Sequence, residues 1–142
     1  MLGPARCAKI PGMEVVNRNR VTPFVTKDTS VIREILAPRN SSLTRQSLAE
    51  ATLGPGQSTE AHLHPRAEEI YYVLAGRGEM AVAGEVRAVE AGDAVALLPG
   101  VPHQIRNTGE RDLVFLCCCA PPYEHDDTEF VPPLLPPEAR RE

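Results

Sequence analysis

The sequence predicts an all-β domain, either a sandwich or a barrel of short strands. From about Thr44 onward, short apolar runs alternate with glycine or proline, a spacing typical of strands that end in tight turns. Turn residues recur at GPG (54–56), GRG (76–78), AGEV (83–86) and EAGD (90–93), which favours antiparallel hairpins over strand-helix-strand units. The chain has 142 residues, 42% hydrophobic and 24% charged, which suits one domain with one core.

The expected elements follow in chain order. Residues 1–12 are interpreted as a flexible extension, 13–130 as the single domain with its core at 44–120, and 131–142 as a proline-rich C-terminal arm. This arm is expected on the surface, where Leu134 and Leu135 could pack on a partner subunit. TSVIREIL (29–36) is expected to be an edge strand rather than a short helix. Further strands are expected in SLAEATL (47–53), AHLHP (61–65), EIYYVLAG (69–76), GEMAVAGEVRAV (78–89), DAVALL (93–98), HQIRN (103–107) and DLVFLCCCA (112–120).

Charge and hydropathy exclude several classes of partner. The net charge is −4 and there is no basic run, so no nucleic-acid partner is expected. The apolar runs are far shorter than the ~20 residues of a membrane-spanning helix, so no membrane partner is expected either. The first residues contain no apolar stretch typical of a secretory signal, and a cytoplasmic location is therefore expected.

The cysteines are distributed unevenly, with Cys7 alone and Cys117, Cys118 and Cys119 consecutive. Neighbouring residues on a strand point to opposite faces, so these three are not expected to form a disulfide framework or a CxxC zinc clamp. Reduced thiols packed in the core are the favoured interpretation. The alternative is that Cys117 and Cys119, which share a strand face, present their thiols to a cavity.

The histidines suggest chemistry. If AHLHP is a strand, His62 and His64 lie on one face, and a carboxylate from the start of the next strand can join them. His103 follows the Pro-Gly turn of a second segment that can lie beside the first. Three imidazoles and one carboxylate on an inner wall would bind a divalent first-row metal and leave positions open for substrate. Alternatively, each histidine is simply a surface or core residue.

Both segments resemble the two motifs of the cupin superfamily. G(X)5HXH(X)4E(X)6G is matched by Gly56, His62, His64, Glu69 and Gly76, and G(X)5PXG(X)2H(X)3N by Gly92, Gly100, His103 and Asn107. One departure is Leu98, which stands at the motif's proline position while Pro99 follows it.

The resemblance implies a double-stranded antiparallel β-barrel of jelly-roll-like form, with irregular arms at both ends. It also implies that His62, His64, Glu69 and His103 bind one metal. Glu68 is the rival carboxylate, although strand parity turns it outward. The four motif glycines are then turn residues and Asn107 a turn or hydrogen-bonding residue.

The resemblance leaves the function open between classes. An enzyme would act on a small oxygen-rich metabolite as a dioxygenase, decarboxylase or isomerase. A binding module would hold a sugar or carboxylate without turnover, and a purely structural domain is a third reading. Fe, Mn, Co, Ni, Cu or Zn would suit the mixed nitrogen and oxygen ligands. A homodimer is also implied, in which an edge strand and the terminal segments cross to the neighbour.

Other residues could contribute to a pocket. Tyr71 shares the inward face with Glu69 and either fills the barrel or orients a substrate. Ile105 is expected to face inward beside His103, and Gln104 and Arg106 outward. Arg45 and Gln46 could line the mouth. His125 lies beside two aspartates in a turn-rich segment, where an exposed cap or salt-linked loop is favoured over a second metal site.

Overall fold

The computed structural model describes residues 12–26 and 30–137. The predicted N-terminal extension at 1–12 lies outside these residues except for Gly12. Cys7 therefore lies outside them too. Two short 3-10 helices, η1 (Arg18–Arg20) and η2 (His125–Asp127), accompany the strands. The strands are β1 (Phe24–Val25), β2 (Val31–Leu36), β3 (Ser47–Leu53), β4 (His62–Leu63), β5 (Glu68–Ala75), β6 (Arg77–Val82), β7 (Glu85–Glu90), β8 (Ala94–Leu97), β9 (His103–Asn107), β10 (Leu113–Ala120) and β11 (Glu129–Phe130).

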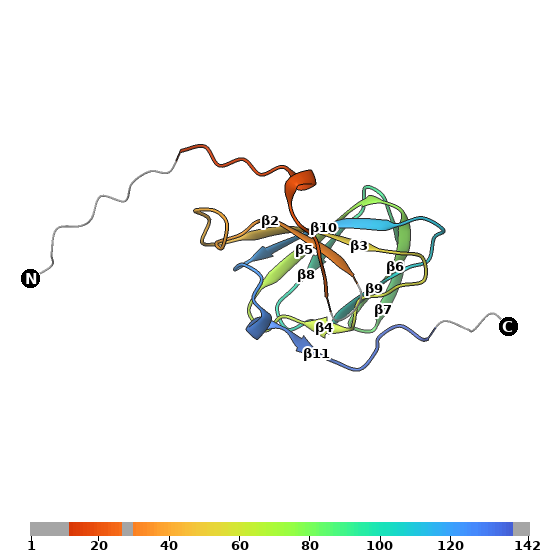
Figure 1. Cartoon of the computed structure of the whole chain (residues 1–142). Helices are drawn as coiled ribbons and strands as arrows, with labels where there is room; N and C mark the ends of the chain where they lie inside the picture. The colour runs from red at the N-terminus through yellow and green to blue at the C-terminus, as the bar shows by residue number, and fades with distance from the viewer. Residues whose placement is uncertain (1–11, 27–29, 138–142) are drawn as a thin grey trace, which may run out of the picture.

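The strands form two antiparallel sheets that face each other (Figure 1). The six-stranded sheet has the order β1-β2-β3-β10-β5-β8, and the five-stranded sheet has the order β11-β4-β9-β6-β7. The all-β prediction is confirmed, and the segment 29–36 contains a strand, β2, as predicted; it is not an edge strand, however, because β1 pairs with its outer side. No helix in the part of the chain that the structure describes is long and apolar enough to cross a membrane.

The predicted hairpins are only partly correct. AGEV does connect a hairpin, β6–β7. At GPG, GRG and EAGD, however, the chain passes from one sheet to the other, and so does the Pro-Gly turn between β8 and β9. Turn residues mark where the chain changes direction, but they do not determine which strands pair. From β3 onward the chain alternates between the two sheets, except at the β6–β7 hairpin.

Gly76 illustrates why one of these crossings requires glycine. Its φ of +83° lies in the left-handed region, and a Cβ there would lie 2.5 Å from the carbonyl oxygen of Asp112. The other predicted turn glycines, Gly56, Gly92 and Gly100, also have positive φ. Gly56, Gly92 and Gly100 lie in turns, and Gly76 lies at a bend between β5 and β6.

The core lies between the sheets and follows strand parity. On β5, Glu69, Tyr71 and Val73 are buried while their neighbours in the chain are exposed. The apolar cluster consists of Ala51, Leu53, Tyr71, Val73, Met80, Val89, Leu97, Ile105, Leu113 and Phe115. Ile105 therefore faces inward as predicted. The sheets thus share one apolar interior.

The C-terminal arm corrects two predictions. Gln104 was expected to be exposed, but it is buried because residues 131–137 cover it. Its side-chain oxygen accepts hydrogen bonds from the backbone nitrogens of Leu134 and Leu135, and its nitrogen donates to Thr59. Leu135 is only 2% exposed within its own chain, so it is not free to pack on a partner subunit.

Asn107 has the hydrogen-bonding role that the motif implied. It is fully buried and donates to the carbonyl oxygens of Leu53 and Arg111, at 2.9 and 2.7 Å. Its side-chain oxygen accepts from the backbone nitrogen of Gly109 at 2.8 Å. Asn107 thereby joins the end of β9 to the end of β3 and to the loop that contains Gly109 and Arg111. It lies at the last position of β9, whereas His103 lies at the first.

Candidate metal centre

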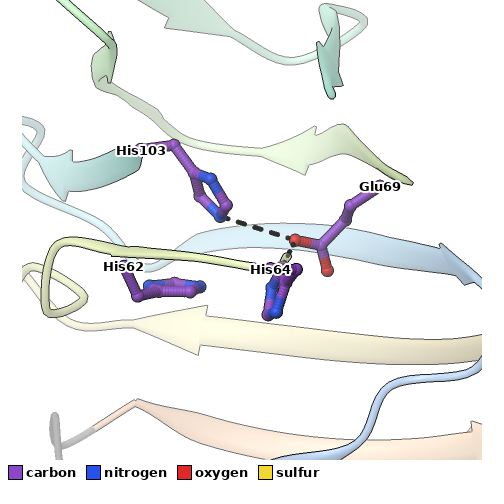
Figure 2. A group of neighbouring side chains, drawn as sticks. All are labelled: His62, His64, Glu69 and His103. Carbon is purple, nitrogen blue, oxygen red and sulfur yellow. Dashed lines mark ion pairs between the residues drawn. The ribbon is translucent and has the colours of Figure 1, made fainter. Parts of the chain in front are cut away.

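Four side chains from three segments meet inside the barrel (Figure 2): His62 on β4 and His64 directly after it, Glu69 on β5, and His103 at the start of β9. Each offers one ligand atom, and these atoms lie within 4.8 Å of one another. β4 pairs with β9 so that His62 and His103 are direct partners, while Glu69 comes from β5 in the other sheet. The predicted proximity of the two motif segments is thus observed.

Backbone carbonyls orient all three imidazole rings. The Nδ1 atoms of His62, His64 and His103 lie 2.7, 2.9 and 3.2 Å from the carbonyl oxygens of Glu60, Asp127 and Val101. A carbonyl oxygen can only accept, so each Nδ1 carries the hydrogen and donates it. The Nε2 atom of each neutral ring is then the one with a free lone pair, as in metal-binding histidines with an outer hydrogen bond.

The Glu69 carboxylate completes the group. Its Oε1 lies 3.4 Å from His64 Nε2 and 3.5 Å from His103 Nε2, which is longer than a good hydrogen bond (Figure 2). Oε1 and His103 Nε2 are both buried without a hydrogen-bond partner. Unsatisfied buried polar atoms are rare and costly, so two of them aimed at one point indicate a position built for a cation. The residues present therefore fit a divalent metal.

The pKa values of His62, His64 and Glu69 depend on one another and on their burial. Burial and the neighbouring His103 lower the pKa of His62 to about 4, which keeps this ring neutral. Burial opposes ionisation of Glu69, but contacts from His103, His64 and the Cys119 thiol outweigh it and lower the pKa to about 2. Burial also opposes protonation of His64, yet the Glu69 carboxylate raises its pKa overall. The Glu69 carboxylate thus favours the protonated form of His64, and a metal ion would displace that proton.

A cavity of about 430 Å³ opens onto His62, His64 and Glu69. Its walls are mainly apolar and aromatic, with contributions from Phe24, Val25, Ile32, Tyr71, Phe115, Tyr123 and Phe130. The ring of Tyr71 packs edge-on against His103, its centroid lies 4.7 Å from that of Phe115, and it lines the cavity. Cavities of this size accommodate small organic molecules.

The thiols occupy positions that core packing alone does not explain. Cys117 and Cys119 both line the cavity, as the less favoured interpretation of the sequence proposed. Cys119 Sγ donates a hydrogen bond of 2.9 Å to Glu69 Oε2. Burial and the Glu69 charge raise the pKa of both thiols, so both remain protonated. Strand parity indicated their shared face, but not that this face meets Glu69.

Asp127 is a functional contributor that the sequence did not reveal. Its backbone oxygen holds His64, and its buried carboxylate accepts from the backbone nitrogens of Arg66 and Ala67 and from the Arg66 side chain. The favoured salt-linked loop is thus observed, and His125 lies in it at the cavity wall. The position of His125 beside two aspartates predicted a loop. Only the fold shows that this loop lies against His64.

The remaining predictions concern residues outside the centre. Glu68 is exposed, as strand parity predicted, so Glu69 is the inward carboxylate. Arg45 and Gln46 are exposed and do not line the cavity, so their proposed place at its mouth is not observed. Among the described residues, the cluster of three histidines and Glu69 is the one group of at least three such side chains close enough to share an ion.

Two facing antiparallel sheets enclose a group of three histidines and one glutamate, in which only His62 is half-exposed. This arrangement defines a class of small β-barrel with a candidate metal centre. Residues 49–119 match the family model described as "Cupin domain". The chain is 45% identical over 113 residues to an uncharacterized protein of Methanocaldococcus jannaschii, which covers 80% of this chain and 90% of that protein. The chain belongs to the cupin family.

Two further similarities involve Thermotoga maritima. An oxalate-binding protein is 41% identical over 68 residues, which are 48% of this chain and 56% of that protein. The crystal structure of a predicted oxalate decarboxylase superposes with a TM-score of 0.70 at 29% identity, covering 75% of this chain and 98% of that one.

Proposed function

We propose that this protein binds one divalent first-row transition metal through His62, His64, Glu69 and His103. The observation that carries the proposal is the pair of buried, unsatisfied atoms, Glu69 Oε1 and His103 Nε2, within a group whose other rings are held by backbone carbonyls. A mixed set of imidazole and carboxylate ligands suits Fe, Mn, Co, Ni, Cu or Zn.

We propose further that the metal centre is that of an enzyme acting on a small oxygen-rich metabolite, by dioxygenase, decarboxylase or isomerase chemistry. When bound, such a metal supplies Lewis acidity and open positions for substrate oxygens. The chain itself fixes the rings through their Nδ1 hydrogens and surrounds the centre with apolar side chains that limit water. Since His62 is neutral, the lone pair of its Nε2 is available to a metal ion at the cavity wall.

Oxalate is the first candidate substrate because both Thermotoga maritima matches carry it in their names. Its adjacent carboxylates can donate two oxygens to one metal ion. The cavity of about 430 Å³ is larger than oxalate requires, which supports including longer oxo-acids and enolisable dicarbonyl compounds in the same screen.

The second candidate is a binding module that holds a carboxylate or sugar without turnover. The name of the oxalate-binding relative favours it. Product formation separates the two candidates: an enzyme converts the ligand, while a binding module is only stabilised by it.

We propose a cytoplasmic homodimer as the state in which the protein acts. An exposed apolar row on β5 supports self-association, since Ile70, Tyr72 and Leu74 are 51, 42 and 44% exposed on the outer face of the six-stranded sheet.

The deciding experiment measures metal content by plasma mass spectrometry in wild-type protein purified without a histidine tag, followed by the oxalate and oxo-acid screen. Near-stoichiometric metal is expected in the wild type and in His125→Ala, a control histidine outside the four-residue group, and none in His62→Ala. Protein that contains no first-row metal and takes up none when supplied would contradict the proposal.

A further inference from the structure

Three strands bring Ser47, Cys119 and Glu69 into one row across the six-stranded sheet. Cys119 on β10 is the direct partner of Ser47 on β3 and of Glu69 on β5. Directly paired residues have their Cβ atoms about 4.5–5.5 Å apart. The pairing therefore holds the thiol against the carboxylate through the backbone, without reliance on a flexible loop.

The two oxygens of Glu69 have different environments. Oε2 accepts the Cys119 hydrogen bond at 2.9 Å, whereas Oε1 has no hydrogen bond and faces the Nε2 atoms of His64 and His103. The last torsion of a glutamate side chain is broad and roughly two-fold, so packing alone fixes the carboxylate plane poorly. A donor on one oxygen removes this freedom and directs the other oxygen at the centre.

The direction of this hydrogen bond is determined by chemistry. An ionised carboxylate can only accept, so the thiol must donate. Both partners are nearly inaccessible to water, at 2 and 5% exposure, and no solvent competes for the bond. Although a thiol is a weak donor in water, it is the hydrogen-bond partner that Oε2 has here.

The same row also reaches a second ligand. Ser47 Oγ accepts a hydrogen bond of 2.9 Å from the backbone nitrogen of Tyr123. The Tyr123 ring packs edge-on against His64, with centroids 5.9 Å apart. Cys119 therefore contacts Glu69, while Ser47 contacts the backbone of Tyr123, whose ring packs against His64. The row lies in the six-stranded sheet, which carries none of the three imidazoles.

We propose that Cys119 is a positioning residue of the metal centre, whose thiol holds Glu69 Oε2 so that Oε1 alone is presented to the ion. This inference rests on the proposed function, because it assumes that the four-residue group binds a metal. The thiol then acts on the metal only through Glu69, and the sulfur is predicted not to bind the ion itself.

The test is a titration of metal-free protein with Co²⁺, followed by calorimetry and by visible absorption. Cys119→Ala is expected to weaken Co²⁺ binding by about 10- to 100-fold, the usual effect of losing an outer partner, and to alter the visible bands. Cys119→Ser retains a donor of similar size and is expected to restore most of the affinity and the wild-type spectrum. Cys117→Ala is the matched control, since Cys117 lies on the same wall of the same strand and is expected to behave as wild type.

The outcomes separate this inference from the proposed function. If wild-type protein takes up no Co²⁺, both fail. If it binds Co²⁺ and Cys119→Ala binds equally well with the same spectrum, only the positioning role is overturned. An equal loss of Co²⁺ affinity in Cys119→Ser and Cys119→Ala would also overturn it, because the packing of the side chain rather than its hydrogen-bond donor would then matter. A sulfur-to-cobalt charge-transfer band that disappears in Cys119→Ser would overturn it by showing direct ligation.

Discussion

His62 and His103 are direct partners in the register of the five-stranded sheet, and their ring centroids lie 4.4 Å apart. Two imidazoles this close cannot both be protonated without strong repulsion, and the low pKa of His62, about 4, reflects burial and this neighbour. The pair is therefore suited to share a cation from outside the chain. This relationship explains why two motifs distant in sequence act as one site.

The first prediction concerns stabilisation by metal. Adding the cognate metal at about 100 times its Kd should stabilise the folded state by about 2.7 kcal/mol. For a chain of this size this raises Tm by roughly 5–10 °C. His103→Ala should abolish the shift, because it removes a buried ligand. Differential scanning fluorimetry with and without a chelator measures the effect.

His125→Ala provides the matched control for this shift, since it removes a histidine outside the four-residue group. It should respond to metal as the wild type does. A full shift in His103→Ala would mean that metal binds elsewhere on the chain.

Much of the site could be predicted from the sequence because its information is local. His62 and His64 are two residues apart, so strand parity already places both on one face, and the same parity turns Glu69 rather than Glu68 inward on the next strand. Tyr71, Ile105 and the turn glycines follow from the same alternation and from turn chemistry.

Features that depend on non-local pairing could not be predicted. GRG and EAGD mark turns, but only the fold shows that the chain changes sheets there. The parity of Gln104 is outward as predicted, yet it is buried because a distant proline-rich segment covers it. Likewise, Cys119 meets Glu69 through the pairing of β10 with β5, which no local pattern encodes.

The second prediction concerns the loop that supports His64. Asp127→Ala removes the acceptor for the buried backbone nitrogen of Ala67 and for Arg66, and should destabilise the protein by about 1–3 kcal/mol. Because Asp127 also lies next to the His64 contact, metal affinity should fall as well. Asp126→Ala, an exposed neighbour, is the control and should change neither property. Urea unfolding and metal titration measure them; equal stability of both variants would rule out this role.

The third prediction concerns self-association through the apolar row on β5. Tyr72→Glu places a charge in the middle of this row, and burying that charge between two copies would be costly. The variant should be monomeric by size-exclusion chromatography with light scattering, whereas the wild type should be dimeric. Val86→Glu makes the same change at an exposed position of the other sheet and should remain a dimer. A wild type that is monomeric at all concentrations would exclude the dimer.

The last prediction concerns the C-terminal arm. Gln104 is the buried polar group that fastens it, with its oxygen accepting from the backbone nitrogens of Leu134 and Leu135. Gln104→Ala leaves these donors without their acceptor and should release the arm, at a cost of about 1–3 kcal/mol.

Limited proteolysis followed by mass spectrometry measures this release, and cleavage within 131–137 should be faster in Gln104→Ala than in the wild type. Arg106→Ala is the comparison, since its guanidinium also bonds the arm, at Pro136, but on the exposed side. It should accelerate cleavage much less, because exposed hydrogen bonds are readily replaced by water. Equal cleavage rates in Gln104→Ala and the wild type would mean that apolar burial of Leu135, rather than the glutamine, holds the arm in place.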